Sequence, residues 1–94
     1  MRLERSLNAL TDRLNRAREE LRILEEQVLF QMDVVEETKT RMLVSETPLA
    51  DRDHHEARSD HTRMLRERDR IQAEIAELQQ EQDRLLDRML GSRT

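Results

Sequence analysis

The chain has no cysteine, tryptophan or tyrosine, and its 94 residues include one phenylalanine, one glycine and one proline. The absence of cysteine excludes a disulfide framework and thiol chemistry. The scarcity of glycine and proline argues against a β-rich fold, because such a fold needs many turn residues. A compact globule needs large side chains to fill its centre, and a single aromatic residue does not supply them. The composition therefore points away from sheets and globular cores.

Long hydrophobic runs and patches of one charge are also missing. No apolar run approaches the roughly 18 residues of a membrane span, and the N-terminal segment has no signal-peptide core. The net charge is −4, and basic residues are interspersed among acids rather than gathered together. Nucleic-acid binding usually relies on basic patches and stacking aromatics. We therefore expect a cytoplasmic protein that neither inserts into membranes nor binds nucleic acid directly.

Charged residues make up 40% of the chain and hydrophobic residues 35%, which is typical either of long helices with a narrow apolar seam or of disorder. Periodicity separates these alternatives. In the first half, residues recur at alternating spacings of three and four: Leu3, Leu7, Leu10, Leu14, Ala17, Leu21, Leu24, Val28, Gln31, Val35, Thr38 and Met42. This heptad pattern predicts one long helix.

A second heptad series follows Pro48. It comprises Ala50, Ala57, Met64, Ile71, Leu78 and Leu85, interleaved with His54, His61, Arg68, Ile75, Gln82 and Met89. Thr47 is a suitable N-cap, and Pro48 suits the first helical position because that position needs no N–H donor. Gly91 is a stop signal. These features predict a second helix, whose seam is more polar than the first.

The two series agree on one turn. Folding the chain at Glu46 sets an a position against a d position throughout, for example Leu14 against Leu78 and Val28 against Met64. We therefore predict an all-α, long antiparallel two-helix coiled-coil hairpin that forms a single domain over residues 1–94. Its predicted elements are a helix over about 2–45, a turn over about 45–48 and a helix over about 48–90. The same register is expected to bring together Arg13 and Glu81, Arg41 and Asp53, Lys39 and Asp51, and, unfavourably, Glu20 and Glu74.

A second set of apolar residues lies outside the seam. The predicted interface comprises Ile23, Leu29, Phe30, Met32, Val34, Leu65 and Leu86. A solitary hairpin would leave these side chains in water, and exposed apolar patches usually mark interfaces. We expect a homodimer in which two hairpins pair into a four-helix bundle. Docking on a larger protein is the alternative, and Phe30 is the expected anchor because aromatics are enriched at interface hot spots.

The predicted tip combines acids with all three histidines: Glu46, Asp51, Asp53, His54, His55 and His61. His54 and His61 are seven residues apart, about 10.5 Å of helical rise, which is too far for one metal ion with bonds near 2 Å. We therefore expect no metal and no cofactor. Because both are seam positions, a second hypothesis is that protonation of these histidines loosens the tip.

The stretch PLADRDHHEA, residues 48–57, resembles the tip of the coiled-coil arm of the Gre transcript-cleavage factors. Leu49, Asp51 and Ala57 match that family's tip, whereas Pro48 and Arg52 depart from it. In the family, the arm enters the secondary channel of RNA polymerase. The resemblance therefore implies a regulator that acts through its acidic hairpin tip.

Enzyme chemistry has no other support in the sequence, which carries no Gly-rich phosphate loop and no combination of nucleophile and base that a concave site would gather. A two-helix rod also offers no pocket of ordinary ligand-binding size. We therefore predict a non-enzymatic protein–protein interaction or adaptor module that self-associates or docks on a larger cytoplasmic machine. The tip regulator described above is the alternative.

Overall fold

The computed structural model describes residues 2–91, and this part of the chain is an all-α helical hairpin. Helix α1 spans Arg2–Ser45 and helix α2 spans Pro48–Gly91, with 44 residues in each and no strand within residues 2–91. The helix predicted over 2–45 is confirmed. Helix α2 begins at the predicted proline but continues one residue further than predicted, because Gly91 is still helical.

The turn consists of Glu46 and Thr47. A backbone hydrogen bond joins Glu46 to the end of α1, and another joins Thr47 to the beginning of α2. Glu46 adopts a left-handed conformation with φ 51°, and its N–H donates to the carbonyl oxygen of Met42 at 3.1 Å. This is the left-handed C-terminal cap that usually carries glycine. Thr47 caps α2 as predicted, since its hydroxyl accepts a hydrogen bond from the N–H of Ala50 at 3.2 Å.

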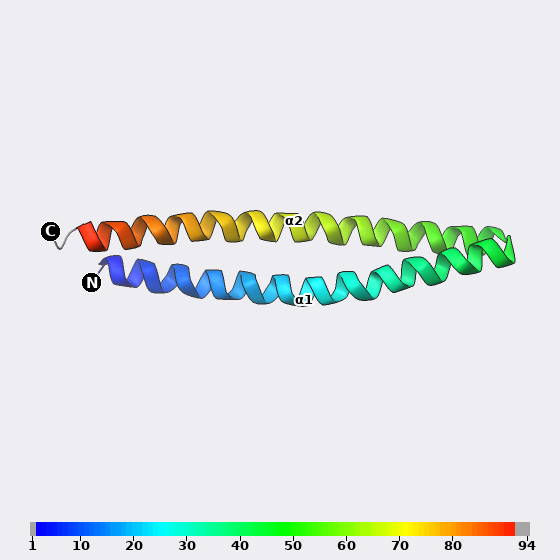
Figure 1. Cartoon of the computed structure of the whole chain (residues 1–94), viewed down its shortest axis with the longest axis horizontal. Helices are drawn as coiled ribbons and strands as arrows, with labels where there is room; N and C mark the ends of the chain where they lie inside the picture. Colours follow the sequence, from blue (N-terminus) through cyan, green and yellow to red (C-terminus); the bar gives the residue numbers. More distant parts are fainter. Residues whose placement is uncertain (1, 92–94) are drawn as a thin grey trace. The chain divides into compact units, whose positions relative to one another are not determined.

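The chain divides into two compact units, each made from a segment of α1 and a segment of α2 running in the opposite direction (Figure 1). The terminal unit comprises residues 2–21 and 70–91 of the described chain, and the turn unit comprises Arg22–Asp69. The single domain predicted over residues 1–94 stays a prediction, and residues 1 and 92–94 lie outside the described part.

The terminal unit has an apolar core. Leu10, Leu14, Ala17 and Leu78 form one buried cluster, with Ile75 and Leu85 packed against it. A polar contact accompanies it: the amide of Gln82 donates to the hydroxyl of Thr11 at 3.2 Å. Leucine therefore supplies most of the burial that joins the two helices of this unit.

The seam of the turn unit is more polar. Its buried apolar residues are Leu24, Val28, Ala50 and Ala57, and they are joined by buried Gln31 and Thr38. The amide of Gln31 donates to the carbonyl oxygen of Ala57 at 2.9 Å, which ties α1 directly to the backbone of α2. Polar seam residues of this kind cost stability but fix the register of two helices.

The pattern of buried residues agrees with the predicted heptad positions. Every residue of the two heptad series is buried or half-buried in the structure. In this register Thr38 lies opposite His54, with the hydroxyl oxygen 3.3 Å from His54 Nδ1. The same hydroxyl also bonds the carbonyl oxygen of Val34 at 2.8 Å.

Surface charges pair mainly along each helix. Arg41 was expected to face Asp53, and the two do line one groove, but the ion pair of Arg41 is with Glu37 on its own helix at 3.8 Å. Glu74, expected to oppose Glu20, likewise lies 3.9 Å from Arg70 one turn earlier. A long charged side chain can reach several opposite charges, so the register of the two helices does not by itself determine which ion pair forms.

Candidate interaction surface

One side of α1 in the turn unit presents an exposed apolar stripe. Ile23, Gln27, Phe30 and Val34 follow spacings of four, three and four, which places them along one side of the helix. The Phe30 side chain is 71% exposed and that of Ile23 is 43% exposed. Both line a shallow groove with Gln27, Gln31 and Met64. We call this surface the Phe30 flank.

The opposite side of the turn unit carries a second stripe. Gln31 lies in the buried seam between the helices. Successive residues of a helix are about 100° apart around its axis. The side chains of Phe30 and Met32 therefore lie on opposite sides of the seam. Met32 is 48% exposed and Leu29, three residues before it, is 65% exposed. The stripe, which we call the Met32 flank, comprises Leu29, Met32, Glu36 and Lys39 on α1 with Asp51, Arg58, Thr62 and Leu65 on α2.

The assignment of α2 residues to these flanks rests on a shared groove. Arg41, seven residues after Val34, lines a groove together with Asp53. Asp53 is therefore on the Phe30 side of α2, and Asp60 and Glu67 follow it at intervals of seven. The residues on the other edge of the α2 seam consequently belong to the Met32 flank.

The predicted interface residues thus divide between two surfaces. Ile23, Phe30 and Val34 lie on the Phe30 flank, whereas Leu29, Met32 and Leu65 lie on the Met32 flank. Leu86, 39% exposed, belongs to the terminal unit. Val34 and Leu65 are half-buried, so each contributes to packing of the hairpin as well as to its surface.

The predicted tip residues are dispersed rather than gathered. Glu46, Asp51 and His55 are exposed, while Asp53, His54 and His61 are half-buried. His54 is held by Thr38 as described above, and His61 Nε2 is buried without a hydrogen-bond partner among the described residues. Within residues 2–91, no group of three or more His, Asp or Glu side chains is placed to hold a metal ion.

The interface predicted from the sequence leaves out three exposed apolar residues that lie beside the turn. Leu43, Val44 and Leu49 are among the most exposed large hydrophobic side chains of the described chain. The first two depart from the heptad pattern, and that departure was the available signal. Leu49 gave no such signal, because a leucine in the first turn of a helix is equally compatible with burial.

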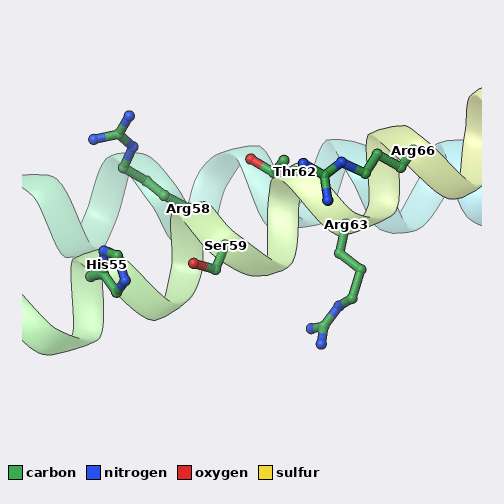
Figure 2. A pocket seen from close by; sticks show the side chains of 6 residues that line it. All are labelled: His55, Arg58, Ser59, Thr62, Arg63 and Arg66. Atoms are coloured by element: carbon green, nitrogen blue, oxygen red, sulfur yellow. The ribbon is translucent and has the colours of Figure 1, made fainter.

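A basic cleft on α2 was also missed. It is lined by His55, Arg58, Ser59, Thr62, Arg63 and Arg66 (Figure 2). Arg58 and Thr62 extend from one side of α2 and Arg63 from the other (Figure 2). Arg63 is paired with Asp60 of its own helix. In the sequence these arginines alternate with acids, and only the helical repeat shows that His55, Arg58, Ser59, Thr62, Arg63 and Arg66 share one stretch of the α2 surface.

Neither helix, over residues 2–91, contains a segment long and apolar enough to cross a membrane. No family model matches the chain, and no significant similarity to a curated protein or to a solved structure is found.

Proposed function

We propose that this chain is a non-enzymatic coiled-coil module for protein–protein interaction, and that it self-associates through the turn unit. The observation that carries the proposal is the exposure of four large apolar side chains within ten residues of α1: Ile23, Leu29, Phe30 and Met32. Water contact with such a concentration of apolar surface is unfavourable, and a second chain would remove it.

Small helical chains gain from association because a two-helix hairpin buries little apolar surface by itself. The polar seam of the turn unit makes this shortage acute, since Gln31 and Thr38 occupy positions where the terminal unit has leucine. Pairing of two copies into a four-helix bundle would place additional apolar contacts beside this seam. A different protein remains the alternative partner, with Phe30 as the expected anchor. The cytoplasmic location expected from the sequence remains a prediction.

The test replaces the exposed apolar side chains without touching the seam. A variant with Ile23→Gln, Leu29→Gln, Phe30→Gln and Met32→Gln should lose self-association, because it removes the exposed apolar surface from both sides of α1 while glutamine keeps a high helix propensity. Sedimentation equilibrium measures the association, and circular dichroism measures the helical content. We expect a dissociation constant raised at least about a hundredfold, given roughly 25 cal/mol per Å² of apolar surface, with the helical signal nearly unchanged.

Leu90→Gln is the matched control. Leu90 is also an exposed apolar residue, but it lies in the terminal unit. Its replacement should leave the association constant within about twofold of the starting chain, as is usual for exposed positions away from an interface. Equal weakening by Leu90→Gln, or unchanged association in the fourfold variant, would contradict a role for the turn unit.

A further inference from the structure

We infer that a second copy of this chain packs on the Met32 flank with the two turns at the same end, which leaves the Phe30 flank free for a different protein. The inference rests on the proposed self-association and adds which face the copies use and how they are oriented. It is carried by the distribution of charge on the two flanks: the Met32 flank carries unpaired charges of both signs that match a second copy, whereas the Phe30 flank would bury charged side chains against apolar ones.

The Phe30 flank is poorly matched to a second copy. Its α1 side carries Phe30 and Val34, whereas its α2 side is charged: it carries Asp53, Asp60 and Glu67, and Asp60 is paired with Arg63 on the same side of the helix. Two copies facing each other through this flank would bury these charged groups against Phe30 and Val34. Burying charged groups against apolar ones is unfavourable.

The Met32 flank carries charges of both signs that lack partners within the hairpin. Among residues 2–91, the side chains of Glu36, Lys39, Asp51 and Arg58 form no ion pair. By contrast, Glu37 on the other side of α1 is paired with Arg41. Arg58 extends to the opposite side of α2 from Arg63 (Figure 2), so its guanidinium is directed toward this flank.

These charges are complementary when the turns lie together. A twofold axis parallel to the helices then stacks α1 of one copy on α2 of the other, with each residue near the level of its neighbour across the hairpin. Leu29 meets Leu65 of the second copy, Glu36 meets its Arg58, and Lys39 meets its Asp51. Because the contact is twofold, each of these pairs forms twice.

The opposite orientation is unfavourable. With the turns at opposite ends, α1 stacks on α1 of the second copy in an antiparallel direction. In the register that sets Leu29 against Met32 of the second copy, Glu25 meets its Glu36, and Arg22, which is paired with Glu26, meets its Lys39. Like charges across an interface are destabilising and suppress the wrong arrangement. The charge pattern thus selects one face and one orientation.

Charge reversal with complementation tests the face. Glu36→Arg and Arg58→Glu should each weaken self-association about tenfold, because each reversal replaces two attractive pairs by two repulsive ones. An equimolar mixture of the two variants should recover the affinity of the starting chain. In the mixed dimer Arg at 36 meets Glu at 58, and the other pair is the original one. Sedimentation equilibrium of each variant and of the mixture measures these affinities.

Glu37→Arg is the matched control for that experiment. It makes the same change of charge one residue further along α1, on the side of the Phe30 flank, and it should alter the affinity by less than about twofold. Failure of the mixture to recover affinity, or equal weakening by Glu37→Arg, would overturn the assignment of the Met32 flank while leaving self-association intact. A chain that is monomeric at every concentration would overturn both proposals.

A spin-label distance tests the orientation. The chain contains no cysteine, so Leu49→Cys offers one labelling site per copy at an exposed position beside the turn. Turns at the same end place the two labels within about two helix diameters, roughly 20 Å. Turns at opposite ends place them about 40 Å apart along the helices, at 1.5 Å per residue. Pulsed electron–electron double resonance distinguishes these values, and a distance near 40 Å would overturn the inferred orientation.

Discussion

At the scale of single residues, Glu46 adopts a backbone conformation that is unfavourable for a residue with a side chain. Its φ of 51° is a left-handed conformation that costs an L-residue other than glycine roughly 1–2 kcal/mol. The conformation persists because it reverses the chain between two long helices. It also lets the Glu46 N–H cap the carbonyl oxygen of Met42. The cost at one residue is thus offset by the packing of the two helices.

Glu46→Gly should therefore stabilise the hairpin. Glycine adopts a positive φ without a steric penalty, although it also gains conformational freedom in the unfolded chain. We expect the free energy of unfolding to rise by up to about 1 kcal/mol, measured by urea denaturation at fixed protein concentration. A decrease would show that the Glu46 side chain contributes more to the turn than its backbone conformation costs.

At the scale of helical segments, the two units differ in what joins α1 to α2. The terminal unit buries Leu10, Leu14 and Leu78. The turn unit buries Leu24 and Val28 but relies on alanine and on hydrogen-bonded Gln31 and Thr38 for its other layers. Smaller and more polar seam residues provide less burial energy per layer. Local opening of the turn unit should consequently require less free energy than opening of the terminal unit.

Native-state hydrogen exchange measures this difference. Amides in the middle of the turn unit segments, away from the turn itself, should exchange at least about tenfold faster than amides in the middle of the terminal unit segments, since 1.4 kcal/mol of local stability corresponds to a factor of ten. The comparison excludes the helix ends, which fray in any case. Equal protection in the two units would mean that the polar layers hold the helices together as firmly as leucine does.

The helices of these segments were predictable because the heptad period is a property of the sequence. Thr47 and Pro48 marked the start of α2, and the spacing of leucines identified the buried side of each helix. The left-handed conformation of Glu46 was not predictable, since glutamate carries no preference for it. Nor did the register determine the ion pair of Arg41, because its flexible side chain reaches Glu37 as easily as Asp53.

The candidate surface was predictable in part. Sequence spacing identified apolar residues outside the seam, and their exposure is seen at Phe30 and Leu29. The prediction places these residues on one surface, whereas the structure divides them between two flanks. That division depends on the side of the seam on which each residue lies. It also depends on which charged side chains have no ion-pair partner on their own helix.

At the scale of the whole molecule, the two sides of the turn unit have different proposed roles. In the proposed dimer, the unpaired charges of the Met32 flank meet a second copy, and the charged α2 side of the Phe30 flank, with its Asp60–Arg63 pair, stays exposed. A chain built in this way would associate with itself without hiding Phe30. The exposed aromatic side chain would then be available to a different protein in the associated state.

The most direct test of the central claim is the mass of the chain in solution, measured by light scattering on a sizing column over a range of concentrations. Self-association through the turn unit predicts a species of twice 11.3 kDa that dissociates on dilution. A mass of 11.3 kDa at every concentration would contradict the account.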